Sequence, residues 1–271
     1  MSAGDDQFLS GTSGYVAGIR ATTRAVAADA LADLFGQTRL QPQRLRRAAR
    51  RWPRRSILVL AIERPDVPNL LAEAREELHR SRHQVRFTSV AAGDRGKFEN
   101  LNLLLSENPP QGHDWLLILD DDVGLPQGFL DSFVFLAERF QFRLAQPAHR
   151  HLSHAAWQVT RRRAASVARK TAFVEIGPVV GLAAATFDVL LPFPALRAGW
   201  GLDAHWSALA RANGWATGVI DAVPISHKLR PIATTYDRTA AINEAREFLT
   251  GRPYTPASEA QRTLAAYNTW K

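Results

Sequence analysis

The chain has 271 residues, no cysteine and a net charge of +8 that comes almost wholly from arginine, since only four residues are lysine. This length suits one large α/β domain with appendages, and the lack of cysteine excludes disulfides and thiolate metal sites. The arginine excess favours phosphate-bearing or anionic partners. We expect a cytoplasmic protein, because the sequence shows neither a secretory signal nor an apolar stretch that would span a membrane.

The N-terminal 54 residues are predicted to form a helical, arginine-rich extension. Residues 15–35 have the apolar spacing of an amphipathic helix that packs on the main domain or on a second subunit of a homodimer. Residues 39–55 carry eight arginines around Trp52 and Pro53. This segment can be a basic helix that meets the inner face of a membrane, at about 1 kcal/mol per basic residue near an anionic surface, or a solvated helix face.

The domain proper is predicted to begin with an apolar strand at residues 56–62. Helical spacing then covers residues 68–80, an alternating strand covers 83–90, and a helix opens after Gly96. An apolar strand, Trp115 to Leu119, follows. This β-α-β-α-β succession predicts a Rossmann-like, mostly parallel sheet with helices on both faces.

The second half of the chain has a less regular pattern. We expect a helix at 129–136, a strand at 142–145, a long loop at 149–170, and a small mixed sheet built from strands at 172–176 and 179–185. A helix at 203–213, a strand at 215–220 and a helix at 236–249 follow. The predicted main domain covers 55–232, and 233–271 is predicted to be a helical tail.

Three consecutive carboxylates, Asp120, Asp121 and Asp122, end the apolar strand. In an extended chain residues two apart face the same side, so Asp120 and Asp122 can point into one cleft. Unpaired, they would raise each other's pKa, and a hard divalent cation removes this conflict. The alternative is a solvated acidic turn, but open α/β sheets bind ligands at the carboxyl ends of their strands.

The triplet resembles the acidic motif of GT-A glycosyltransferases, most closely the bacterial family 2 type. The likeness extends to three other stretches: residues 95–102 (RGKFENLN), 199–203 (GWGLD) and 226–230 (SHKLR). It covers about residues 55–232. The resemblance implies transfer of a sugar from a nucleotide diphosphate donor, with UDP as the first expectation and GDP as the next, to an acceptor hydroxyl that can be lipid- or glycan-linked.

The resemblance also implies roles for individual residues. Asp120, assisted by Asp121, would contact the donor nucleotide, while Asp122 and His227 would bind Mn²⁺ or Mg²⁺. Neutralising the charge of the leaving diphosphate is what such a cation does. Further donor-site residues are expected to be Ala61, Glu63, Arg95, Lys97, Asn100, Lys228 and Arg230. Residues expected to shape the acceptor site are Glu175, Gly181, Trp200 and Gly201.

Asp203 is the expected catalytic base, because it matches the acidic residue that deprotonates the acceptor in inverting members. Family 2 members commonly have a Glu-Asp pair here, whereas this chain has Leu202 before Asp203. The alternative for Asp203 is a helix N-cap, and both roles are compatible. His227 taken alone is more typical of a surface histidine than of a ligand, and its place after an apolar strand and beside Lys228 and Arg230 is what favours a ligand. The alternative for Arg95 and Lys97 is a solvated helix start.

Other functions explain the pattern less well. A phosphatase of the haloacid dehalogenase type would carry its acidic motif on the first strand, and a nucleotidyltransferase would need a glycine-rich loop after residue 62. The chain shows no motif for binding nucleic acid. The alternative outside the enzymes is a non-catalytic protein that has a glycosyltransferase-like fold and binds carbohydrate or polyanions.

Overall fold

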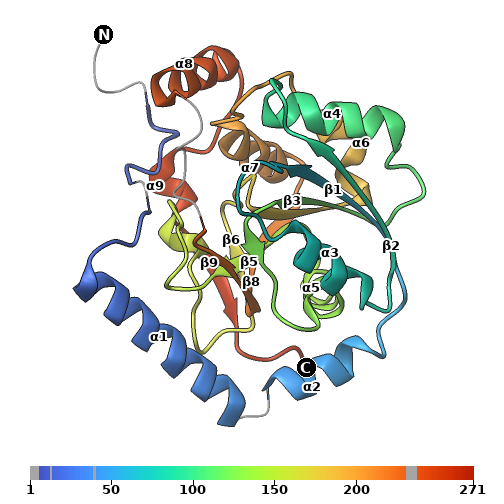
Figure 1. Cartoon of the computed structure of the whole chain (residues 1–271), viewed down its shortest axis with the longest axis vertical. Helices are drawn as coiled ribbons and strands as arrows, with labels where there is room; N and C mark the ends of the chain where they lie inside the picture. Colours follow the sequence, from blue (N-terminus) through green and yellow to red (C-terminus); the bar gives the residue numbers. More distant parts are fainter. Residues whose placement is uncertain (1–5, 13, 39–40, 230–236) are drawn as a thin grey trace.

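The computed structural model describes residues 6–12, 14–38, 41–229 and 237–271, and shows a large mixed β-sheet flanked by helices (Figure 1). The sheet has nine strands in the order β2-β1-β3-β7-β5-β8-β6-β9, and β4 pairs with β8. Helices α3 and α5 lie on one side of the sheet and α4, α6 and α7 on the other (Figure 1). The predicted α/β class is therefore confirmed.

The strands are β1 (Ser56–Glu63), β2 (Gln84–Ala91), β3 (Trp115–Asp120), β4 (Val123–Gly124), β5 (Phe142–His149), β6 (Ala168–Thr171), β7 (Val179–Ala183), β8 (Ala216–His227) and β9 (Thr263–Tyr267). The α-helices are α1 (Ile19–Thr38), α2 (Gln41–Ala49), α3 (Leu71–His79), α4 (Lys97–Glu107), α5 (Phe129–Arg139), α6 (Phe187–Leu190), α7 (Leu202–Ala212), α8 (Arg238–Leu249) and α9 (Ala257–Ala260). None of the helices formed by the described residues is both long and apolar enough to cross a membrane.

The first half of the sheet is the predicted parallel unit. Strand β1 pairs in parallel with β2 and β3, and α3 and α4 connect them. A hydrophobic core lies on each face of the sheet, and alternate residues of β1 point into one or the other. Ile57 and Val59 pack with α3 and α5, whereas Leu58 and Leu60 pack with α4 and α7. Side chains alternate between the two faces along a strand, and helices cover each face, so both faces are buried.

The rest of the sheet differs from the prediction of a mostly parallel sheet. Strand β7 lies antiparallel between β3 and β5, and β6 is antiparallel to both β8 and β9. Strand β7 starts at the edge where β3 ends, so it must run back. The expected separate small sheet is continuous with the main one, and β6 precedes the segment predicted to be a strand, 172–176.

The C-terminal segment is more than the predicted helical tail. Helix α8 packs Ala245, Phe248 and Leu249 into the core on the α4 side. Strand β9 then joins the sheet through antiparallel pairing with β6. Half-buried and exposed positions alternate along β9. Its residues, TLAAY, do not alternate between apolar and polar, and Leu264 is exposed, so the sequence alone did not indicate an edge strand.

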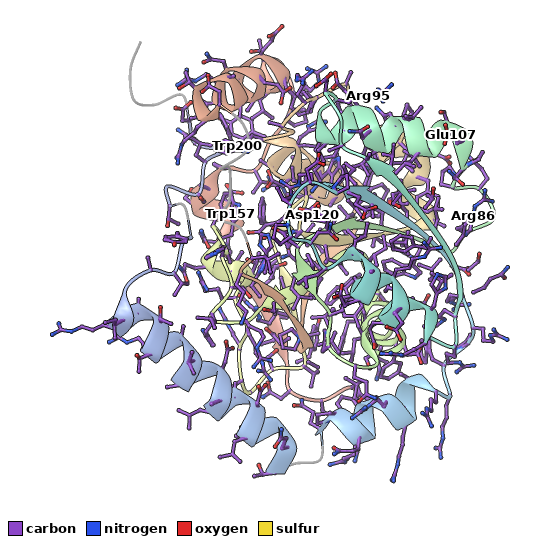
Figure 2. All side chains as sticks on the ribbon, in the orientation of Figure 1. Arg86, Arg95, Glu107, Asp120, Trp157 and Trp200 are labelled. Atoms are coloured by element: carbon purple, nitrogen blue, oxygen red, sulfur yellow. The ribbon has the colours of Figure 1, made fainter. Side chains whose placement is uncertain are left out.

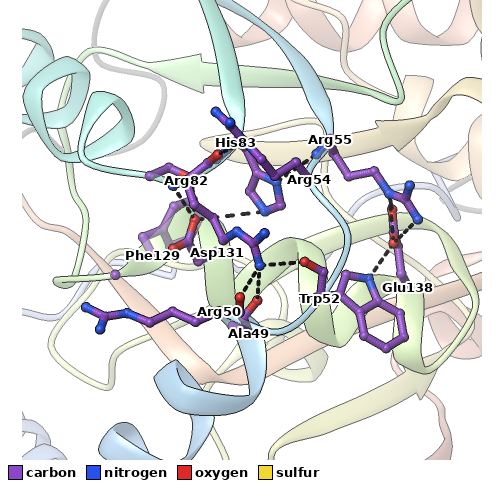
Figure 3. A network of polar contacts seen from close by, with 12 residues as sticks. Ala49, Arg50, Trp52, Arg54, Arg55, Arg82, His83, Phe129, Asp131 and Glu138 are labelled. Carbon is purple, nitrogen blue, oxygen red and sulfur yellow. Dashed lines mark hydrogen bonds and ion pairs between the residues drawn. The ribbon is translucent and has the colours of Figure 1, made fainter.

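A network of polar contacts fixes α2 to the domain (Figure 3). The guanidinium of Arg82 donates to the carbonyl oxygens of Ala49 (3.3 Å), Arg50 and Trp52 (2.5 Å). These carbonyls lie at and just beyond the C-terminus of α2, where a cation is favoured. Arg55 forms an ion pair with Glu138 of α5 at 2.8 Å, so the chain leaving α2 is held where β1 begins.

An ion pair between Arg169 of β6 and Asp221 of β8 lies wholly inside the protein. Arg169 Nε is 2.8 Å from Asp221 Oδ2, and both side chains are fully buried. Arg169 also donates to the carbonyls of Val159 and Arg161, each at 2.7 Å. The pair therefore connects two strands with the 149–170 segment, and its loss would leave one buried charge unpaired.

We predict that Asp221→Ala lowers the free energy of unfolding by about 3 to 5 kcal/mol, because Arg169 would remain buried without its partner. Urea denaturation followed by circular dichroism measures this change. The matched control is Glu259→Ala, which removes the exposed Arg211–Glu259 pair and should cost less than about 1 kcal/mol. Equal effects of the two substitutions would contradict the assignment.

Candidate functional site

One cavity of about 1000 Å³ opens at the carboxyl ends of β1 and β3. Most of the residues predicted for the site line it: Arg95, Lys97, Asn100, Asp120, Asp121, Asp122, Glu175, Trp200, Gly201, Asp203 and His227. They come from β3, α4, α7, β8 and the loops between them. Figure 2 marks the positions of Arg95, Asp120, Trp157 and Trp200 around this region. The sheet thus brings together side chains that are more than 100 residues apart.

Each carboxylate of the triplet has a basic partner on a different element. Asp120 Oδ1 lies 2.6 Å from Lys97 Nζ at the start of α4. Asp121 is buried and accepts from the backbone N–H (2.8 Å) and the guanidinium (2.9 Å) of Arg64 after β1. Asp122 Oδ1 lies 3.2 Å from His227 Nε2 at the end of β8. The repulsion expected within the triplet is therefore relieved by three separate basic side chains.

Asp121 differs in orientation from its neighbours. Its carboxylate binds the loop after β1, and its backbone carbonyl accepts from Leu70 N at 2.6 Å. These bonds make Asp121 a residue that positions the loop leading to α3. Its predicted assistance in nucleotide binding stays a prediction.

The imidazole of His227 lies between a carbonyl oxygen and a carboxylate, which fix its orientation. Its Nδ1 lies 3.2 Å from the carbonyl oxygen of His154, so this nitrogen carries the proton that is donated. Its Nε2 then faces Asp122. Burial lowers the pKa of His227, but the hydrogen bond and charge of Asp122 outweigh burial and raise the pKa above its ordinary value.

Asp122 and His227 fit a divalent cation as a pair of ligands. A metal-binding histidine normally donates its second ring N–H to a carbonyl or carboxylate, as His227 does to His154. Among the described residues, no group of three or more His, Cys, Asp or Glu side chains is arranged to hold a metal ion. Two protein ligands still suit Mg²⁺ or Mn²⁺, because such ions often keep waters and bind substrate phosphates.

Asp203 lies in the first turn of α7 and lines the cavity. The N-cap position belongs to Gly201, whose φ of 80° is readily adopted only by glycine, so the alternative that Asp203 is an N-cap is wrong. The carboxylate accepts from Ala204 N at 2.8 Å. Burial and the negative charge of Glu175 raise the pKa of Asp203 to about 7. A carboxyl with such a pKa is suited to accept a proton near neutral pH.

Glu175 is buried and has partners, as expected for a carboxylate inside an apolar segment. Its Oε2 lies 2.8 Å from His149 Nε2, and Thr160 Oγ1 donates to its Oε1 at 3.3 Å. Its backbone N–H donates to the side chain of Gln146. No local pattern connects His149 with Glu175, because the parallel pairing of β5 with β8 is what brings His149 to the cavity.

The start of α4 is held by its neighbours. Asn100 is fully buried and donates to the carbonyl of Ala92 at 2.9 Å, so it positions the loop before the helix. The N–H of Lys97 donates to the carbonyl of Arg197 at 2.7 Å. A side chain at Gly96 would come within 2.1 Å of Arg197 Cα. This close approach requires glycine at position 96 and fixes Lys97 beside Asp120.

Five predicted site residues are not part of the cavity as described. Ala61 is buried in β1, and Gly181 is buried in β7 against Phe133. Glu63 and Lys228 lie next to lining residues but do not line the cavity. Arg230 lies outside the described residues. For Ala61 and Gly181 the reason is strand geometry, since both positions face the core on the α5 side.

Two further walls of the cavity were not predicted from the sequence. Residues 8–12 line it, with Phe8 buried in the core and the Asp6 side chain 2.8 Å from Arg246. Asp237, Arg238 and Glu244 of the α8 region line it as well, and the guanidinium of Arg238 lies over the ring of Trp200. These segments fall outside the part of the chain that resembles glycosyltransferases, so no motif pointed to them.

Comparisons with known proteins give little beyond the general architecture. No protein-family model matches the chain, and no curated protein matches it. Among solved structures, A197 from STIV is similar with a TM-score of 0.46 and 10% identity, over 64% of this chain and 85% of that one. GalNAc-T7 with UDP, GalNAc and Mn²⁺ is similar with a TM-score of 0.46 and 9% identity, over 72% of this chain and 48% of that one.

We predict that Asp122→Asn lowers the pKa of His227, because the neutral amide removes the charge that favours the imidazolium. Titration of the histidine ring protons by NMR measures the shift, and the loss of one signal in His227→Gln assigns it. His113, whose pKa is lowered by burial and by Arg86, serves as an internal control and should not move. An unchanged His227 titration in Asp122→Asn would contradict the described pairing.

Proposed function

We propose that the protein is a metal-dependent glycosyltransferase of GT-A type, which transfers a sugar from a nucleotide diphosphate donor to an acceptor hydroxyl with inversion. The observation that carries this proposal is the meeting of Asp122, His227 and Asp203 in one cavity of about 1000 Å³. Such a transfer requires ligands for a divalent cation and a carboxylate that acts as a base, and both would lie in this cavity.

The donor side of the cavity is the end formed by β3 and α4. A divalent cation held by Asp122 and His227 would neutralise the charge that develops on the leaving diphosphate. Lys97 and Arg95 line the same end and can bind phosphate oxygens. Asp120 lies beside Lys97 and can accept hydrogen bonds from the nucleoside. We expect UDP first and GDP next as the nucleotide.

The acceptor side is the end formed by the start of α7. Asp203 takes the proton of the acceptor hydroxyl as its oxygen attacks the anomeric carbon, and the bond from that carbon to the diphosphate oxygen breaks. Because this is one displacement, the anomeric configuration inverts. Trp200 and Glu175 line this end and can contact the acceptor. The acceptor of the transferred sugar can be lipid- or glycan-linked.

We predict that UDP or GDP binds with a requirement for Mn²⁺, and that Asp122→Ala abolishes this metal-dependent binding, because the cation joins the diphosphate to Asp122. Isothermal titration calorimetry with each nucleotide, with and without Mn²⁺, measures it. Asp188→Ala, an exposed aspartate on α6, is the matched control and should bind like the unsubstituted protein.

Two results of this titration separate the alternatives. Absence of binding for either nucleotide in the presence of Mn²⁺ contradicts the donor site. Metal-dependent binding without any turnover of the corresponding sugar nucleotides favours the non-catalytic carbohydrate-binding alternative over the enzyme.

We predict that the rate of transfer or of slow donor hydrolysis falls as the pH drops below about 7, because Asp203, whose raised pKa is about 7, must be ionised to act as a base. Asp203→Asn should lower kcat by about a hundredfold to ten-thousandfold. Donor affinity should change little, because Asp203 lies at the acceptor end.

The control for this prediction is Asp188→Asn, which should retain both the rate and its pH profile. If Asp203→Asn kept the full rate with an unchanged profile, another group would be the base. NMR of the product's anomeric proton tests inversion independently, and retention of configuration would contradict the single displacement.

A further inference from the structure

Helix α1 exposes its large apolar side chains. Among the described residues, five of the nine large hydrophobic residues that are exposed lie between residues 15 and 34: Tyr15, Ile19, Val26, Leu31 and Leu34. The exposed fractions are 87% for Ile19 and 68% for Leu31. The side of α1 that packs on the protein consists of smaller residues such as Ala25, Ala32 and Gly36. Several large apolar side chains exposed on one helix favour an interaction site, because monomers rarely expose large apolar patches.

The acidic residues of α1 point away from this face. Asp29 is buried and accepts from the backbone N–H of His151 (2.9 Å) and Leu152 (3.0 Å). Asp33 pairs with Arg162 at 2.5 Å and also with Arg150. Arg20 and Arg24, in contrast, are exposed, and α2 contains no acidic residue. The outer surface of α1 and α2 therefore combines apolar and positively charged side chains.

A second cavity, of about 440 Å³, lies at the junction of α1, α2 and the C-terminal residues. Arg44, Arg47 and Arg51 line it together with Lys271, and no acidic residue does so among the described residues. The spacing of three and four residues puts the arginines on one side of α2 and its extension. Within the described part of the chain, their side chains form no ion pair, so their charge is available to an anion.

The arginines of this cavity are presented by a fixed element. Leu45 and Ala49 are buried in the core, and Arg82 binds the carbonyls at the end of α2 (Figure 3). In Figure 2 the side chains of α2 that end in nitrogen extend away from the body of the protein, on the edge where α1 also lies. The cationic and apolar surfaces thus belong to one edge of the molecule.

We propose that this edge binds the surface of an anionic phospholipid membrane. The headgroup phosphate would occupy the cavity lined by Arg44, Arg47 and Arg51, while the apolar side chains of α1 enter the boundary between headgroups and acyl chains. Interfacial helices bind in this way, through apolar burial together with attraction between basic side chains and anionic lipid. The proposal goes beyond the proposed function and does not depend on it.

A second copy of the chain suits this edge less well. A symmetric dimer places the same patch of each subunit against itself. The exposed arginines of α1 and α2 would then meet like charges, and the acidic residues of α1 that could pair with them are already bound inside the protein. An anionic bilayer supplies both the missing negative charge and an apolar layer.

The test is co-sedimentation of the full chain with phosphatidylcholine vesicles, with and without phosphatidylglycerol, at low and high salt. We expect binding only to the anionic vesicles, with weaker binding at high salt because salt screens the charges. The triple variant R44Q/R47Q/R51Q should reduce the partition coefficient by about a hundredfold, since each basic residue near the surface contributes about a factor of five.

The variant I19S/L31S/L34S should reduce the partition coefficient by at least about tenfold, because it removes apolar surface that the membrane would bury. Two matched controls remove equivalent groups outside α1 and α2, namely R75Q/R143Q/R252Q and V67S/V189S/L264S. Both controls should bind like the unsubstituted protein. Since all substituted positions are exposed or half-exposed, circular dichroism should show each variant folded.

Three outcomes would overturn the proposal. The first is no binding to anionic vesicles, and the second is equal losses for the test variants and their controls. The third is a dimer in light scattering that I19S/L31S/L34S dissociates while vesicle binding is absent, which would assign the face to a second copy. Nucleotide binding by calorimetry is a separate readout, so failure of the donor site and failure of the membrane surface are distinguishable.

Discussion

The structure of the site depends on how three adjacent carboxylates at the end of β3 are neutralised. Three adjacent carboxylates repel one another unless each has a partner. The protein places a different basic side chain beside each of them: Lys97 from α4, Arg64 after β1, and His227 from the end of β8. The same three contacts that stabilise the triplet therefore join the main elements around the cavity.

In this arrangement Asp121 has a structural role, whereas Asp120 and Asp122 are the carboxylates proposed to bind ligands. The buried Asp121 holds the loop after β1. In the proposed function, a divalent cation would replace the contact between Asp122 and His227, and Lys97 would bind phosphate in place of Asp120. Asp203, whose pKa burial raises to about 7, lines the same cavity and would take up the proton in the proposed function.

Much of this could be predicted from the sequence, because it follows from local patterns. The apolar strands β1 and β3, the alternating strand β2 and the helix after Gly96 are all confirmed as elements. Long-range pairing could not be predicted: β7 runs antiparallel between β3 and β5, and β9 joins the edge of the sheet. His149 reaches Glu175 only through such pairing. Ala61 and Gly181 were assigned to the site, but strand geometry turns both toward the core.

The central claim is that Asp122 and His227 hold a divalent cation that also contacts the donor diphosphate. Pulsed electron paramagnetic resonance of Mn²⁺ in the presence of UDP or GDP tests it directly, because hyperfine couplings identify the atoms bound to the metal. The account predicts a nitrogen coupling, lost in His227→Gln, together with a phosphorus coupling from the nucleotide. A spectrum with water ligands alone, or with phosphorus but no nitrogen coupling, would contradict it.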